Sequence, residues 1–344
     1  MIELTIIVPT FNSIKFIEEC FESLKKFELR ADTQIIVLDD GSTDGTLKFI
    51  HNNRFKNMEI IENNHLGVSR QRNLGISLAE GTYVTFIDSD DIVEFAAYSE
   101  VLDSNEYENN DLIIMSENIK QENNKCDVEG TSALQWLLNL NSDIAEYNPI
   151  QWGPVSKFYK RSILLDHGIR FPENQSRGED LIFNLHVLSV VNRVKLFKLK
   201  AYGYRKNVAS AMGKASYVTV INNNEILSEI SAVAEKKLDV EEAARANLYW
   251  LVMISLSNLI MFYSKNWQYI NEVRIQSKVL RKTYTESSER HFVNNQLKKH
   301  YWILLNILIN LPVAVTLLMM KIMKAVNKSI NSSAEISGEV INWI

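Results

Sequence analysis

Cysteine and proline are scarce in this sequence, and glycine is nearly confined to its first two thirds. Two of the 344 residues are cysteine, Cys20 and Cys126, too few for a disulfide framework and suited to a reduced cytosolic compartment. Four of the 5 prolines lie at or before Pro172, and eleven of the 12 glycines at or before Gly213. Because these residues punctuate turns, we expect a turn-rich first part and long helices after it.

The sequence also has no excess of basic over acidic residues. Lysine and arginine number 37 against 42 acidic residues, a formal net charge of −5, which excludes the attraction behind nonspecific nucleic-acid binding. The amino terminus carries Glu3 where a signal peptide would carry positive charge, so secretion is not expected. With 46% hydrophobic and 23% charged residues, the chain should fold, as one large domain and a smaller one.

Strand and helix patterns alternate through the first quarter of the chain. β-Branched, apolar runs predict strands at 4–8, 34–38, 58–61 and 83–87. Helices are expected after Ser13, with Ser13 as the cap and an apolar stripe of Ile17, Cys20, Phe21 and Leu24, and again at 46–50 and 68–79. This order implies an α/β fold with a mostly parallel sheet, whose ligands bind beyond the carboxyl ends of the strands.

Acidic side chains follow two of these strands. Asp39 and Asp40 come after the second, and Asp88, Asp90 and Asp91 after the fourth. One such cluster could be a turn with a helix cap, but two at one sheet edge repel each other and favour a shared site for a cation. Mg²⁺ and Mn²⁺ are held by one or two carboxylates plus substrate phosphates. A phosphatase forming an aspartyl-phosphate also places Asp-x-Asp after a strand, but no lysine motif completes such a site here.

Four ordered motifs resemble those of family 2 glycosyltransferases, which have the GT-A (Rossmann-like) fold. They are Thr5–Asn12 (TIIVPTFN), Asp39–Asp44 (DDGSTD), Arg72–Ile76 (RNLGI) and Phe86–Asp91 (FIDSDD). The similarity weakens at 94–150, returns at 152–210 and stops beyond about residue 215. The resemblance implies a GT-A domain at 1–215, with a nucleotide-sugar half at 1–91 and an acceptor half at 92–215. A helical region at 216–344 follows it.

The resemblance implies an inverting enzyme that moves a sugar from a nucleoside-diphosphate donor, a UDP-sugar, to an acceptor hydroxyl. Asp40 would accept a hydrogen bond from uracil, Asp88 would hold ribose or metal-bound water, and Asp90 would ligate Mn²⁺ or Mg²⁺. Arg72 has a guanidinium fork suited to a phosphate or to orienting Asp88. The remaining implied nucleotide-binding residues are Pro9, Thr10, Phe11 and Ser89.

The acceptor half carries the implied base. Asp180 matches the family's base, and Glu179 would orient it or touch the acceptor, although an acid pair opening a helix is by itself an ordinary first-turn feature. Trp152, Lys157 and Arg177 are expected acceptor contacts, since sugars stack on aromatic faces and hydrogen-bond to basic groups. Trp152 reads equally as a packing residue beside Gly153 and Pro154.

Three positions depart from the family pattern. His65 stands where asparagine usually precedes the matched Gly67 by two residues, although Asn63 and Asn64 adjoin it. Gln71 replaces an alanine, for which the sequence offers no reason. Lys206-Asn207 stands where some relatives carry a metal-binding histidine, so a third protein ligand for the cation is missing there.

The chain from 302 to 320 is the longest apolar stretch. Its 19 residues include four that are not apolar, Asn306, Asn310, Pro312 and Thr316, and lysines flank it. Three structures are compatible with this stretch. It could attach to a membrane interface, it could be a helix that spans the membrane, or it could be a helix that is buried or forms an oligomer contact. Attachment would place a cytoplasmic enzyme at the inner face of a bacterial inner membrane, beside a lipid-linked saccharide acceptor in surface polysaccharide synthesis.

Two other functions remain open at this point. A nucleotidyltransferase that forms nucleotide sugars usually has a glycine-rich loop with a basic residue near the first strand, and Pro9–Asn12 is not one. A non-catalytic scaffold at the membrane would not need the acidic residues, all of which are present.

Overall fold

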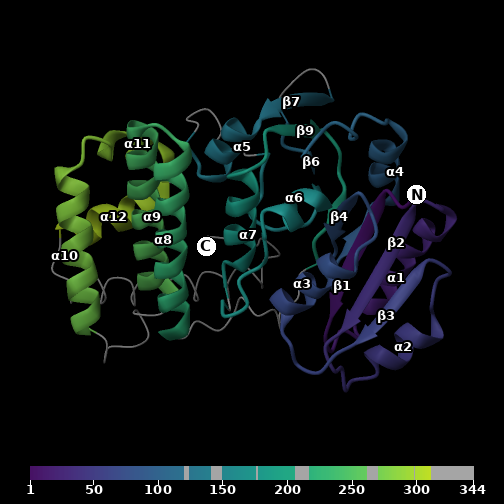
Figure 1. Cartoon of the computed structure of the whole chain (residues 1–344). Helices are drawn as coiled ribbons and strands as arrows, with labels where there is room; N and C mark the ends of the chain where they lie inside the picture. The colour runs from purple at the N-terminus through teal and green to yellow at the C-terminus, as the bar shows by residue number, and fades with distance from the viewer. Residues whose placement is uncertain are drawn as a thin grey trace, which may run out of the picture. The chain divides into compact units, whose positions relative to one another are not determined.

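The computed structural model describes residues 1–119, 124–140, 149–175, 177–205, 217–261, 270–297 and 299–310. Contacts divide the chain into two units (Figure 1). The first, here the N-terminal unit, comprises Met1–Gly213 with Glu235–Leu238, and the second, the C-terminal unit, comprises Lys214–Ala234 with Asp239–Ile344. The assignment of donor and acceptor halves within the first unit stays a prediction.

The N-terminal unit is built on a sheet which, within the described ranges, has the order β3-β2-β1-β4-β8-β6-β9-β7. Its strands are β1 (Leu4–Thr10), β2 (Thr33–Asp39), β3 (Met58–Glu62), β4 (Tyr83–Phe86), β6 (Leu112–Met115), β7 (Lys125–Glu129), β8 (Lys157–Lys160) and β9 (Arg193–Phe197). Two short strands, β5 (Ile92–Val93) and β10 (Tyr202–Gly203), pair antiparallel beside it. The four strands expected from the sequence are confirmed, and so is a mostly parallel sheet.

Strand direction determines where a ligand can bind. β1, β2, β3 and β4 are parallel, and β6 is parallel to β9. β8 runs antiparallel to both β4 and β6, so the parallel strands on its two sides point the same way. Therefore β1, β2, β4, β6 and β9 all end at one edge of the sheet, the carboxyl edge, where β8 begins.

Helices cover the sheet because their apolar faces match it. α1 (Ile17–Lys25) buries Ile17, Cys20, Phe21 and Leu24, the predicted stripe. α2 (Thr46–Asn52) and α3 (Val68–Leu78) also form as expected. In α3, a Cβ on Gly75 would stand 2.5 Å from the Ile7 side chain, so glycine allows this helix to lie close against β1.

The predicted cap of α1 is wrong. The helix begins at Ile17 without a side-chain cap, and the Ser13 carbonyl accepts the Ile17 N–H. The Ser13 hydroxyl instead lies 2.7 Å from the Ser89 hydroxyl. A tertiary contact to the loop after β4 has replaced the local capping bond.

The other helices of the N-terminal unit are η1 (Lys26–Leu29), a 3₁₀ turn, then α4 (Phe95–Asp103), α5 (Gly130–Leu137), α6 (Arg161–Asp166) and α7 (Glu179–Leu188). The helices that follow are α8 (Tyr217–Lys237), α9 (Val240–Met261), α10 (Ile270–Glu286), α11 (Arg290–Gln296) and α12 (Lys299–Asn310). The expected change to long helices is confirmed.

The apolar stretch predicted at 302–320 is only partly described. Residues 302–310 belong to α12, where Leu305 and Leu308 are buried while Trp302 and Ile303 are exposed. Residues 311–320 lie outside the described residues. Within the described ranges, every helix is too short or too polar to cross a bilayer.

Candidate active site

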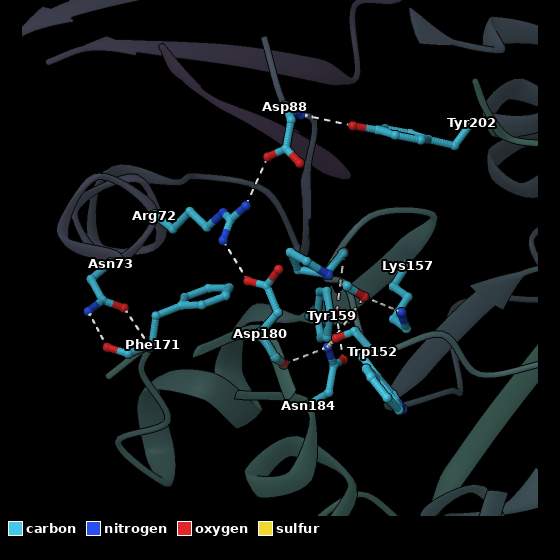
Figure 2. A network of polar contacts seen from close by, with 12 residues as sticks. Arg72, Asn73, Asp88, Trp152, Lys157, Tyr159, Phe171, Asp180, Asn184 and Tyr202 are labelled. Atoms are coloured by element: carbon cyan, nitrogen blue, oxygen red, sulfur yellow. Dashed lines mark hydrogen bonds and ion pairs between the residues drawn. The ribbon is translucent and has the colours of Figure 1, made fainter. Parts of the chain in front are cut away.

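Arg72 on α3 joins the two halves of the expected site. Its guanidinium donates to Asp88 Oδ1 at 2.8 Å and to Asp180 Oδ1 at 2.6 Å (Figure 2). The Phe171 ring packs 5.1 Å from the guanidinium carbon. Arg72 is 3% exposed, so of the two roles suggested by its sequence, the observed contacts support orienting carboxylates rather than presenting an N–H to a phosphate.

Burial changes the acid–base character of the expected base. Asp180 lies in the first turn of α7, and desolvation raises the pKa of its carboxyl, opposed by the Arg72 charge and reinforced by Asp88. Desolvation likewise raises the pKa of Glu179, and the Asp180 charge adds to the effect. A carboxylate with a raised pKa takes up a proton more readily, as a general base requires.

Hydrogen bonds from Tyr202 and Arg205 hold the loop after β4 in place. The Tyr202 hydroxyl donates to Asp91 Oδ2 at 2.9 Å and accepts the Asp88 N–H at 3.1 Å. The backbone N–H of Arg205 donates to Asp91 Oδ1, and its side chain donates to the Asp90 carbonyl. Asp91 is therefore a structural anchor, whereas Asp88 is drawn toward Arg72.

Tyr202 and Arg205 received no role from the sequence. A signal was present, because Tyr202 to Arg205 (YGYR) lies within the range 152–210, where the similarity to the family returns. What was missing was the knowledge that β10 pairs with β5 directly after the acidic loop.

Asp40 directly follows β2 at the carboxyl edge, and its carboxylate is largely engaged. It accepts hydrogen bonds from the Leu66 N–H at 2.6 Å, the Gly67 N–H at 2.8 Å and the Gln71 amide at 2.7 Å. Three of roughly four acceptor positions are therefore used. Asp40 holds the turn before α3, and little capacity remains for the expected uracil contact.

The structure explains why glutamine stands at position 71. Its amide nitrogen donates to Asp40, and its oxygen accepts from Asn63 Nδ2 at 3.1 Å. An alanine could not link the two. Asp39, which precedes Asp40 in the acidic cluster, is fully buried, and its Oδ1 has no hydrogen-bond partner among the described residues.

The end of β1 forms the other wall of this region. Pro9 and Thr10 are buried, and the Thr10 carbonyl accepts the Asp40 N–H at 2.8 Å. The Phe11 ring is half-exposed and meets the His65 ring edge-on at 5.4 Å between centroids. His65 thus stands beside the aromatic residue expected to face the base, which the family pattern did not suggest.

A divalent cation fits this region only with help from a substrate. Within the described ranges, no group of three or more His, Cys, Asp or Glu side chains is arranged to hold a metal. Mg²⁺ needs only one or two carboxylates when phosphates supply other ligands. Asp90 and Asp88, alternate residues of one loop, match that donor set.

The three predicted acceptor contacts differ in placement. Trp152 is 46% exposed and Arg177 is half-buried, but Lys157 is only 1% exposed. The Lys157 ammonium donates to the carbonyls of Gln151, at 2.9 Å, and of Gly153. Lys157 therefore holds a loop, and a direct acceptor contact is not supported.

Lys157 makes stability depend on pH. Burial lowers the pKa of its ammonium to about 7, although Asp180 opposes the shift. Between pH 7 and the ordinary lysine pKa of about 10.4, the unfolded chain therefore binds more protons, so stability rises with pH. Relative to Lys157→Met, we expect the unfolding free energy of the wild type to increase by about 1 kcal/mol per pH unit over this window.

Urea unfolding at pH 7, 8 and 9 measures the difference between the two proteins. Lys48→Met, at an exposed lysine on α2, is the matched control and should show no pH-dependent difference. Parallel pH curves for the wild type and Lys157→Met would show that Lys157 stays charged in the folded protein.

Comparison with known proteins gives consistent results. The profile of "Glycosyl transferase family 2" matches residues 5–193. The poly(ribitol-phosphate) beta-N-acetylglucosaminyltransferase TarS of Staphylococcus aureus is 30% identical over 248 residues, covering 71% of this chain and 42% of TarS. EpsJ of Bacillus subtilis, an uncharacterized glycosyltransferase, is 28% identical over 59% of this chain and 61% of its own. The chain thus matches less than half the length of TarS.

Solved structures show the same fold. TarS 1–349 in complex with UDP-GlcNAc superposes with a TM-score of 0.63 at 21% identity, covering 93% of this chain and 89% of that one. The mannosyltransferase PcManGT from Pyrobaculum calidifontis, in complex with GDP-Man and Mn²⁺, has a TM-score of 0.50 at 15% identity, covering 93% and 87%.

Proposed function

The chain belongs to glycosyl transferase family 2 and is a glycosyltransferase of GT-A fold, and from this we propose that it moves a sugar, with inversion, from a UDP-sugar to a hydroxyl of a bacterial cell-surface polymer. The observation that carries the proposal is the bridge from Asp88 through Arg72 to Asp180. It brings the acidic loop after β4 and a candidate base together at the carboxyl edge. Family membership favours this function over a nucleotidyltransferase or a scaffold.

On the donor side, Phe11, with Pro9 and Thr10 behind it, would line the base pocket. Asp40 would support that pocket through the turn it holds. Ser89, fixed by Ser13, and Asp88 would face the ribose and diphosphate. The UDP-GlcNAc and UDP complexes of TarS support a uridine donor.

Asp90, together with Asp88, would hold Mn²⁺ or Mg²⁺ when the donor is bound. Such an ion supplies positive charge that stabilises a departing diphosphate. The Mn²⁺ in PcManGT supports a divalent cation at this fold. Arg72 meanwhile keeps Asp88 and Asp180 in place, and Asp180 takes the proton of the acceptor hydroxyl.

The acceptor would be a saccharide or a polyol-phosphate chain, as the name of TarS suggests for that relative. The exposed Trp302 and Ile303 of α12 support contact of the C-terminal unit with a membrane surface. A lipid-linked acceptor at the cytoplasmic face would then be within reach.

A panel of nucleotide sugars tests the function. With Mn²⁺ present, we expect at least one UDP-sugar to bind in a calorimeter and to release UDP slowly without acceptor. The same protein should not form pyrophosphate from UTP and a sugar 1-phosphate. Pyrophosphate formation, or no turnover of any nucleotide sugar, would contradict the proposal.

A further inference from the structure

Phe171 lies in the stretch between α6 and α7 that forms neither helix nor strand, yet it is only 1% exposed. Its backbone is paired with a side chain 98 positions away. The amide of Asn73, on α3, donates to the Phe171 carbonyl at 2.9 Å and accepts the Phe171 N–H at 2.9 Å (Figure 2). Because a buried backbone needs partners for its N–H and its carbonyl, Asn73 supplies the two bonds that a neighbouring strand would otherwise make.

A second tie between α3 and the same stretch is exposed and therefore weak. Arg70 donates to the Glu173 carboxylate at 2.9 Å, and the two side chains are 49% and 43% exposed. Surface ion pairs of this kind contribute little to stability. Asn73 is only 3% exposed, so water does not compete for its bonds. The stretch is therefore held to α3 mainly by Asn73, the residue directly after Arg72.

The Phe171 ring contacts each of the three elements that carry the Arg72 bridge: α3, the end of β4, and α7. From α3, the Arg72 guanidinium carbon lies 5.1 Å from the centre of the ring. Phe86, the last residue of β4 before the acidic loop, meets the ring edge-on at 5.2 Å between centroids. Phe183, one turn after Asp180 on α7, stacks on it at 3.9 Å, with 7° between the planes. The ring is therefore a spacer shared by all three elements.

The Arg72 guanidinium depends on this ring, because its hydrogen bonds alone do not fix its orientation. Two of its nitrogens donate to Asp88 and Asp180, but Nε is buried without a hydrogen-bond partner among the described residues. Bonds to two separate carboxylates let the planar group tilt about the line that joins them. An aromatic face packed on the cation opposes that tilt, and the attraction is strongest where water is excluded.

The orientation of Arg72 matters because it holds two carboxylates that come from different parts of the chain. We propose that Phe171, held by Asn73, is a positioning residue for sugar transfer. Its ring fixes the orientation of Arg72 and, through Arg72, the positions of the Asp88 and Asp180 carboxylates.

This role rests on the proposed function and adds to it the part of the fold that keeps the candidate base in position. Neither Phe171 nor Asn73 touches a substrate in it. Both act through Arg72, so their replacement should change the chemistry of Asp180 and not only the stability of the protein.

Two variants of the full-length protein test this role, with the donor identified in the panel. Phe171→Leu keeps an apolar side chain but removes the planar face, and Asn73→Ala removes both bonds to the Phe171 backbone. We expect each to lower kcat at saturating acceptor about tenfold or more, since displacing a catalytic group by about 1 Å can cost 10²-fold. Urea unfolding identifies a temperature at which each variant is folded during the assay.

The pH profile separates positioning from a purely structural effect. The charged groups that act on the Asp180 carboxyl are Arg72, Asp88, Lys157 and Glu179. Burial raises the pKa of Asp180, and the Arg72 charge opposes this rise. A tilted guanidinium would oppose it less, so the acid limb of acceptor-dependent kcat/KM should move to higher pH in both variants. A variant that is merely less stable would keep the wild-type limb, because its folded molecules have an unchanged site.

Arg70→Ala is the matched control, because it removes only the exposed ion pair to the same stretch. It should keep the wild-type kcat and the wild-type acid limb. An unmoved limb in both Phe171→Leu and Asn73→Ala would overturn the positioning role, and so would an equal shift in Arg70→Ala. A wild type that turns over no nucleotide sugar would contradict the proposed function, and this role with it.

Discussion

Replacing Asp180 with asparagine is expected to remove sugar transfer while leaving donor binding intact. The amide oxygen can still accept a hydrogen bond from Arg72, which now lies 2.6 Å from Asp180 Oδ1, but the side chain can no longer take a proton. General-base catalysis contributes about 10²–10⁴-fold, so kcat should fall by that factor. Calorimetry should find an unchanged donor Kd, and transfer is followed with a saturating acceptor.

The pH profile gives this prediction a second readout. Burial raises the pKa of Asp180, and the protonated acid cannot act as a base. Acceptor-dependent kcat/KM should therefore fall as the pH drops, with its acid limb above the range of an ordinary aspartate, and Asp180→Asn should lack that limb. Glu179→Gln is the neighbouring control, for which we expect a smaller loss. Unchanged transfer in Asp180→Asn would remove this residue from the base role.

Chelating the divalent cation is expected to stop UDP release, and Asp90→Ala should do the same at any Mn²⁺ concentration that saturates the wild type. Positive charge at a departing diphosphate is worth several kcal/mol, so the loss should be about 10²-fold or more. UDP release is measured for the wild type and for Asp90→Ala, first with a chelator and then after excess Mn²⁺ is added back. The wild type should recover and Asp90→Ala should not.

Asp103→Ala is the matched control, because it removes an exposed carboxylate that pairs with Arg30 on the surface. It should respond to chelation and add-back like the wild type. Release that persists in the chelated wild type would show that the protein uses no exchangeable cation. Recovery of Asp90→Ala by Mn²⁺ would assign the ion to other ligands.

The local pattern of the sequence predicted most of the fold of residues 1–91. The run from Leu4 to Val8 is buried along its whole length in β1, and the stripe of α1 is buried at the predicted spacing. Both patterns follow from neighbouring residues, since a strand buried on both faces must be apolar throughout and a helix repeats every 3.6 residues. The acidic loops after β2 and β4 could be placed at one edge for the same reason.

Prediction failed for side chains whose hydrogen-bond partners are distant in the sequence. Ser13 reads as a helix cap but bonds to Ser89, and Gln71 reads as an unexplained departure but links Asp40 to Asn63. Lys157 reads as an exposed acceptor contact because lysine is rarely buried. Its burial depends on a loop outside the local pattern of β8, in which the carbonyls of Gln151 and Gly153 accept its hydrogen bonds.

By itself, the sequence determined the fold class, the order of the motifs and the identity of the acids, because periodicity and strand ends are properties of short segments. Only the tertiary structure decided which carboxylates the Arg72 guanidinium pairs with. Arg72 and Asp180 are 108 positions apart, and the bond between them exists because α3 and α7 meet near the carboxyl edge and exclude water around a guanidinium that two carboxylates must then share.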